Sequence, residues 1–236
     1  MLYWLLKHLL LGPLLWVAFR PWVRGIENVP KDGPVIITGN HLSFVDSIFM
    51  PLVLDRQVFF LAKSEYFTGR GFKGWVQRVF FTAVGQIPID RSGGKASEAS
   101  LNSGLQVLAE GKQLGIYVEG TRSPDGRLYR GRTGLARMVL ESGAPVVPAV
   151  MFYSGPILPI GSKWPRVRRV GVVFGEPMDF SRYAGLESDR FVLRAITDEI
   201  VYEIQRISGQ EYVDVYASSV KARSSGATQK AEKVAA

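Results

Sequence analysis

Short apolar runs alternate with segments of helical periodicity along most of this chain, and this alternation limits the possible folds more than any other feature. An apolar run of about four to eight residues suits a buried strand, whereas apolar residues spaced i, i+3, i+4 and i+7 suit one face of a helix. The pattern predicts an α/β domain with a single central sheet, mixed but largely parallel, and flanked by helices. We expect strands at residues 35–38, 56–62, 84–91, 113–118, 145–151 and 170–174. We expect one helix that follows the first strand and ends near residue 54, and further helices over residues 72–80, 94–111, 132–142 and 187–207.

The composition is that of a folded chain with a basic surface. Of the 236 residues, 47% are hydrophobic and 21% are charged, which fits one substantial domain with appendages. The chain has no cysteine, so a disulfide framework, a thiolate zinc site and a cysteine nucleophile are excluded. A formal net charge of +8 suits an anionic partner such as a nucleic acid, an anionic lipid or a phosphorylated substrate, and charge alone does not choose among them.

Residues 2–19 form the most apolar segment of the chain. A secretory signal would end at small residues, and the sequence at 20–24 offers no such site. A membrane span needs about 20 apolar residues, and Pro13 should kink or split a helix here. Because tryptophan and arginine suit lipid headgroups, we expect residues 1–24 to form a broken helix that dips into one leaflet, in preference to a span. This segment would hold the protein at the cytoplasmic face of the cell membrane, as a monotopic or peripheral protein.

The helix predicted at residues 72–80 has two interpretations. Its apolar residues share one face, and basic residues lie off that face at Arg70, Lys73 and Arg78. The face would suit packing on the core or contact with lipid. We favour packing on the core.

The rest of the chain divides into a folded domain and a tail. Residues 25–210 should form the α/β domain, and residues 211–236 a polar, disordered tail, because the last part of the chain lacks aromatic residues and periodicity. Within the domain, the loop at 156–169 places Trp164 among arginines, which suits either RNA or a lipid surface.

Polar side chains gather where the predicted strands end. In α/β sheets, ligands bind at the carboxyl ends of the strands. We therefore expect a site formed by the side chains that follow these strands, which are His41 with Asp46, Lys63, Asp90 with Arg91, and Glu119 to Arg122.

His41 is the candidate proton acceptor. The chain has two histidines, and the other, His8, lies inside the apolar N-terminal segment. A histidine with an ordinary pKa near 6.5 accepts protons at neutral pH, and Asp46 could hold its tautomer and stabilise the imidazolium. Ser43 and Asp46 also have the spacing of a capping box. Asp46 could therefore cap the helix only, or cap it with one oxygen and contact His41 with the other. With one histidine so placed and no cysteine, we expect no metal site.

Four blocks of sequence resemble those of the glycerophospholipid acyltransferase family. They are Asn-His with Asp after four more residues at 40–46, Gly-x-Ile-x-Ile-Asp-Arg at 85–91, Glu-Gly-Thr-Arg-Ser at 119–123, and Val-Pro-Ala-Val at 147–150. The blocks occur in the family's order, and the resemblance covers residues 25–180. It is most specific in the first and third blocks, and it extends to the 1-acylglycerol-3-phosphate acyltransferases within the family.

The resemblance implies an activity and a set of partners. The protein would move a fatty acyl group from an acyl thioester, carried by coenzyme A or acyl carrier protein, to the free sn-2 hydroxyl of lysophosphatidic acid. The membrane surface, with anionic lipid, would be a further partner. No cofactor, metal or nucleic acid is implied.

The resemblance also assigns roles to residues. His41 would be the general base and Asp46 would orient it. Glu119 would position an arginine or the acceptor, or would only pair with an arginine. Candidates for binding the acceptor and its phosphate are Arg122 first, Arg91 second, and then Glu119, Gly120, Thr121 and Lys63. The apolar residues Phe59, Phe60 and 72–81 could form an acyl groove, although packing in the core is the interpretation we favour.

Three alternatives stay open. The same chemistry would serve glycerol-3-phosphate, another lysophospholipid or a glycolipid as acceptor. A thioesterase or lipid hydrolase would use the same base on water, but no serine lies in a Gly-x-Ser-x-Gly elbow. A basic module that binds membranes or RNA would not be an enzyme, and no recognisable RNA-binding motif is present.

Overall fold

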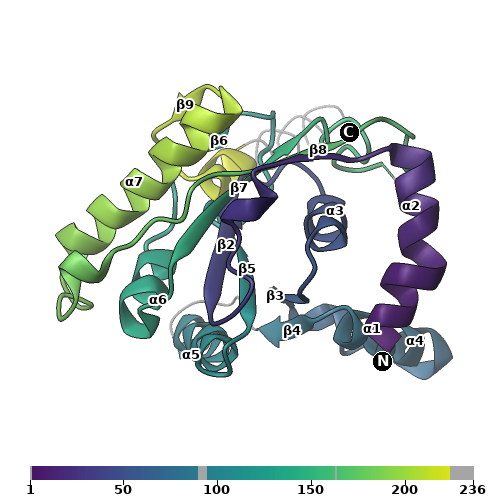
Figure 1. Ribbon diagram of the computed structural model, residues 1–236, viewed down its shortest axis with the longest axis horizontal. Coiled ribbons are helices and arrows are strands. Elements are labelled where there is room, and N and C mark those ends of the chain that lie inside the picture. The colour runs from purple at the N-terminus through teal and green to yellow at the C-terminus, as the bar shows by residue number, and fades with distance from the viewer. Residues whose placement is uncertain (1, 90–94, 163, 224–236) are drawn as a thin grey trace, which may run out of the picture.

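The computed structural model describes residues 2–89, 95–162 and 164–223, and it confirms the expected α/β fold (Figure 1). A seven-stranded sheet has the order β1-β8-β7-β2-β5-β3-β4. Strands β7, β2, β5, β3 and β4 are parallel, β8 is antiparallel to β7, and β1 is parallel to β8. The strands are β1 Trp22–Arg24, β2 Val35–Gly39, β3 Val58–Lys63, β4 Gln86–Ile89, β5 Gln113–Tyr117, β7 Val146–Phe152 and β8 Gly171–Phe174.

Helices cover both faces of this sheet. On one side lie α1 Leu2–Leu5, α2 Leu11–Phe19, α3 Asp46–Val53 and α4 Gly71–Ala83, and on the other lie α5 Lys95–Ala109, α6 Gly134–Ser142 and α7 Arg190–Ser208 (Figure 1). Strand β2 is buried along its whole length, because successive side chains point to opposite faces and each face is covered. Thus Ile37 packs in the α3 core, whereas Ile36 packs in the core formed with α5, α6 and α7.

The N-terminal segment, Leu2–Phe19, is helical without interruption, so the helix expected to be broken is instead continuous and changes pitch along its length. A π-helical turn, Leu6–Leu10, joins α1 to α2, and Pro13, in the first turn of α2, cannot donate a backbone N–H to the carbonyls of the turn before it. Residues Leu2–Phe19 are long and apolar enough to cross a membrane, and only 17% of them are buried. Lys7 nevertheless donates to the carbonyls of Pro51, at 3.0 Å, and of Leu54, at the end of α3. This contact fixes the segment to the domain.

The expected burial of the apolar face of α4 is wrong. Phe72 is 76% exposed and Trp75 is 53% exposed, and within α4 only Gly74 is buried. The helix lies at the far end of the molecule from α7 (Figure 1). Periodicity correctly identifies the apolar face, but it does not show that no other part of the described chain covers that face.

The predicted boundaries also need correction. Strand β1 lies inside the segment assigned to the membrane, although it belongs to the central sheet. The tail was predicted to begin at 211, yet β9 Tyr212–Val213 pairs with β6 Leu128–Tyr129, and residues 217–223 are helical with Ala217 fully buried. The reason is a contact with a segment far earlier in the chain. Residues 224–236 of the predicted tail lie outside the described residues.

Candidate active site

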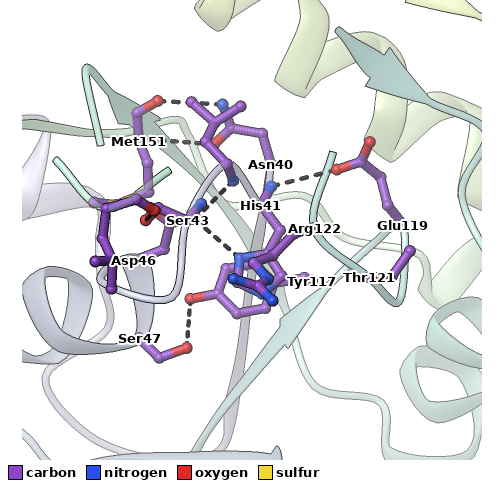
Figure 2. A network of polar contacts seen from close by, with 12 residues as sticks. Asn40, His41, Ser43, Asp46, Ser47, Tyr117, Glu119, Thr121, Arg122 and Met151 are labelled. Atoms are coloured by element: carbon purple, nitrogen blue, oxygen red, sulfur yellow. Dashed lines mark hydrogen bonds and ion pairs between the residues drawn. The ribbon is translucent and has the colours of Figure 1, made fainter. Parts of the chain in front are cut away.

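His41 and Asp46 are in direct contact. Strand β2 ends at Gly39 and α3 begins at Asp46, so the intervening loop turns back on itself and brings His41 Nδ1 to 2.9 Å from Asp46 Oδ2 (Figure 2). Asp46 is fully buried, and the His41 side chain is 15% exposed. Because a carboxylate accepts, Nδ1 carries the proton, and a neutral imidazole then has its acceptor nitrogen at Nε2.

The predicted capping box forms only in part. Asp46 Oδ2 accepts the N–H groups of Leu42 at 2.7 Å and Ser43 at 2.8 Å, in addition to His41. The Ser43 hydroxyl does not cap α3 and instead donates to the carbonyl of Leu158 at 2.8 Å. Asp46 Oδ1 is buried with no hydrogen-bond partner in the described part of the chain. The expectation that one Asp46 oxygen caps the helix while the other contacts His41 is therefore wrong. Oδ2 alone accepts the hydrogen bonds from the loop and contacts His41.

Tyr117 is a site residue that the sequence patterns did not reveal. It ends β5 and lies in register with Gly39 at the end of β2. Its ring is stacked on that of His41, with centroids 3.8 Å apart and planes 6° apart. Its hydroxyl is 3.0 Å from Ser47 Oγ, and burial raises the pKa of Tyr117 well above its usual value. A neutral ring thus supports one face of the imidazole.

Asn40 connects the first block of the motif to the fourth. Its side chain accepts the N–H of Met151 at 2.8 Å and donates to the Met151 carbonyl at 3.2 Å. Met151 lies on β7, directly after the Val-Pro-Ala-Val block. Next to Asn40, Gly39 passes so close to β7 that a Cβ would lie 1.8 Å from the carbonyl oxygen of Ala149. The start of the His41 loop is therefore anchored on β7.

Glu119 connects two loops through their backbones. One oxygen accepts the N–H of His41 at 3.3 Å and the other accepts the N–H of Tyr129 at 2.8 Å. The side chain is almost fully buried, and this burial raises the pKa of Glu119 from 4.5 to about 7. His41 is held from the other side as well, because its carbonyl accepts the N–H of Ser123 at 2.6 Å. Of the roles expected for Glu119, the described contacts support neither an arginine pair nor a position facing the acceptor.

Arg122 and its neighbours form the cationic side of the site. The Arg122 side chain is partly exposed and extends toward the His41 and Tyr117 rings in Figure 2. Gly120 has φ near 70°, a left-handed conformation that favours glycine. Lys221 donates to Thr121 Oγ1 at 2.9 Å and to the Arg122 carbonyl. Sequence patterns missed Lys221 because it lies in the segment expected to be a tail.

The two remaining cationic candidates are placed differently. Lys63 ends β3 and forms an ion pair with Glu65 at 2.5 Å, with both side chains more than half exposed. Arg91, with Asp90, lies outside the described residues. The structure therefore brings together His41, Asp46, Thr121 and Arg122 and leaves Arg91 unplaced.

A cavity of about 1450 Å³ opens beside these residues. His41, Lys63 and Arg122 line it, and so do apolar side chains from the N-terminal helix, the sheet and α4, among them Leu6, Leu11, Leu15, Phe60 and Phe81. Phe59, the other residue expected in an acyl groove, packs in the core on the opposite face of the sheet. The cavity joins a polar region around His41 to an extended apolar region.

A histidine–aspartate pair that opens on a cavity of this kind defines an α/β enzyme suited to a substrate with both polar and apolar parts. Residues 20–152 match the acyltransferase family, which is more than half of the chain. The chain belongs to the acyltransferase family.

Individual relatives carry more specific names. The 1-acyl-sn-glycerol-3-phosphate acyltransferase of Bacillus subtilis is 30% identical over 186 residues, which cover 78% of this chain and 86% of that protein. The chloroplastic 1-acyl-sn-glycerol-3-phosphate acyltransferase BAT2 of Brassica napus is 31% identical over 61% of this chain. The matched region spans only 41% of the length of BAT2. The crystal structure of the 1-acyl-sn-glycerophosphate acyltransferase PlsC from Thermotoga maritima has a TM-score of 0.62 and 24% identity, covering 83% of this chain and 76% of that one. That similarity establishes the fold.

Proposed function

We propose that this protein transfers a fatty acyl group from an acyl thioester to the free sn-2 hydroxyl of 1-acylglycerol-3-phosphate, giving phosphatidate. The observation that carries the proposal is the His41–Asp46 pair, 2.9 Å apart, at the wall of a cavity that Arg122 also lines. The named activity of the Bacillus subtilis relative supports the same reaction.

The proposed chemistry needs a base and no enzyme nucleophile. His41 Nε2 takes the proton of the acceptor hydroxyl as its oxygen attacks the thioester carbonyl, and Asp46 stabilises the imidazolium. When the tetrahedral intermediate collapses, the C–S bond breaks and the imidazolium returns the proton to the departing thiolate. A thioester is already activated toward attack by a hydroxyl. General base catalysis, which raises a rate about 10²–10⁴-fold, is therefore applied to a reaction whose barrier is already low.

The acceptor is held by its phosphate in this proposal. A guanidinium donates two parallel hydrogen bonds to phosphate oxygens, so Arg122 is the principal ligand, with the Gly120–Thr121 backbone beside it. Lys63 lines the same cavity and could leave Glu65 for the phosphate. Arg91 stays a candidate from its place in the motif.

The apolar part of the cavity would hold acyl chains. Pockets for drug-sized ligands occupy about 300–1,000 Å³, and this cavity is larger at about 1450 Å³. Leu11 and Leu15 of the N-terminal helix line it, so a chain could pass between the site and a membrane in which that helix lies. We accordingly propose a monotopic or peripheral protein at the cytoplasmic face, with acyl-CoA or acyl carrier protein as donor.

A panel of acceptors tests the assignment. One long-chain acyl thioester is offered with lysophosphatidic acid, glycerol-3-phosphate, lysophosphatidylcholine or no acceptor, while free thiol and lipid products are measured. We expect thiol release and phosphatidate only with lysophosphatidic acid. Equal release without acceptor would instead identify a hydrolase, and transfer to glycerol-3-phosphate alone would change the acceptor.

A further inference from the structure

Helix α4 has an apolar face that the described chain leaves uncovered. Five large apolar side chains repeat at helical spacing along this face, and all are exposed: Phe72, Trp75, Val76, Val79 and Phe80. A helix of a soluble domain normally packs such a face on the core. Several exposed large side chains together mark a contact site for another molecule.

The N-terminal segment also has an exposed apolar surface, and it lines the same cavity as α4. The cavity is bordered by Tyr3 of α1, by Leu6 of the π-helical turn and by Phe80 of α4. The N-terminal segment exposes its own apolar residues, including Leu9, Leu14 and Val17. Two helices with exposed apolar residues therefore line the same cavity.

The charges around these two helices favour an anionic lipid surface as the occupant. Residues 66–89 contain Arg70, Lys73 and Arg78 but no Asp or Glu. Residues 1–24 also lack acidic residues, and their exposed cations are Arg20 and Arg24, since Lys7 donates to carbonyls of the domain. Cationic residues beside apolar anchors bind anionic membranes through both kinds of contact. A surface for a second copy of this chain would need acidic groups to match these cations, and neither helix provides them.

We propose that α4 is a second membrane-contacting helix, which inserts Phe72 and Trp75 among lipid headgroups beside the N-terminal segment. The cavity that both helices line would then lie next to the bilayer. This inference concerns how the protein meets the membrane and does not depend on acyl transfer.

Labelling at single positions tests the proposal, because the chain has no cysteine. A Phe72→Cys variant and a matched Phe191→Cys variant each carry one environment-sensitive fluorophore. Phe191 is 73% exposed, similar to Phe72 at 76%, but it lies on α7 at the other end of the molecule (Figure 1). With vesicles that contain phosphatidylglycerol, we expect a blue shift at position 72 and none at position 191. Equal spectra at both positions, or a shift at 72 caused only by protein concentration or by acyl carrier protein, would overturn the proposal.

Vesicle flotation gives an independent measurement. The double variant Phe72→Ser/Trp75→Ser should bind phosphatidylglycerol vesicles at least about tenfold more weakly than the wild type, because two large apolar side chains no longer leave water. The matched double variant Phe191→Ser/Tyr202→Ser should bind as the wild type does. Since all four side chains are exposed, each variant should keep the wild-type melting temperature. Wild-type vesicle binding by the α4 variant would contradict the proposal, whatever the enzyme assay shows.

Discussion

The ring of Tyr117 lies flat against the ring of His41, with centroids 3.8 Å apart. The two residues are more than 70 positions apart in the chain, His41 in the loop after β2 and Tyr117 at the end of β5, and the register of these strands brings them together. Asp46 fixes the imidazole at its edge and Tyr117 supports its face, so the orientation of His41 is determined twice.

The stack predicts different results for two substitutions of Tyr117. Tyr117→Phe keeps the ring and loses only the contact with Ser47, so kcat should change by less than about threefold. Tyr117→Leu removes the flat surface, and misplacing a catalytic group by about 1 Å lowers the rate about 100-fold. Steady-state kinetics with both substrates saturating measures the two effects. Equal losses in both variants would show that the hydroxyl, and not the stacked ring, supports His41.

The raised pKa of Glu119 predicts how the stability of the folded protein depends on pH. Its pKa is raised from 4.5 to about 7 in the folded protein, so the folded state binds the proton more tightly than the unfolded state does. The wild type should therefore lose stability as the pH rises from about 4.5 to 7, by about 3 kcal/mol. Glu119→Gln resembles the protonated form and lacks this loss. Urea unfolding of both proteins at several pH values gives the difference, and parallel curves would show that the carboxyl has an ordinary pKa.

Arg122 should contribute to binding of the acceptor rather than to the rate of the acyl transfer step. Arg122→Ala removes hydrogen bonds between charged groups worth about 1.5–3 kcal/mol, so the apparent KM for lysophosphatidic acid should rise about 10–100-fold. Arg182→Ala is the matched control, because Arg182 pairs with Glu199 on the opposite side of the sheet. An unchanged KM would remove Arg122 from the phosphate site.

Lys221 should act through the Thr121–Arg122 segment that it holds. Lys221→Met removes both of its hydrogen bonds to that segment, and the acceptor KM should rise about three- to tenfold by the loss of a charge-assisted contact. Lys221→Arg keeps a donor and should restore most of the affinity. If Lys221→Met and the wild type have the same KM and the same melting temperature, this segment needs no support from the C-terminal helix.

The sequence predicted the architecture because the evidence for it is local. The sequence of β2 is a short apolar run because both faces of the strand are buried. The sequence of α7 predicts a helix because its apolar residues repeat at helical spacing. His41 and Asp46 were identifiable because a strand end, a loop and a helix start follow one another directly in the chain.

The residues that were missed depend on contacts between distant segments. Nothing near Tyr117 indicates that its ring meets His41, since only the register of β2 with β5 brings them together. Lys221 contacts residues about 100 positions earlier, and its own segment resembles a disordered tail. The error at α4 has the same origin, because the sequence shows the apolar face, whereas only the arrangement of distant segments decides whether that face is covered.

Substitution of His41 tests the central proposal most directly. Thiol release from a long-chain acyl thioester with lysophosphatidic acid is compared among the wild type, His41→Ala and His8→Ala, in detergent micelles so that membrane binding does not limit the rate. His8 is the matched control, because it stacks on Trp4 in the N-terminal helix. We predict that kcat falls about 10²–10⁴-fold in His41→Ala and stays near the wild-type value in His8→Ala. Near-wild-type turnover by His41→Ala would contradict its role as the general base.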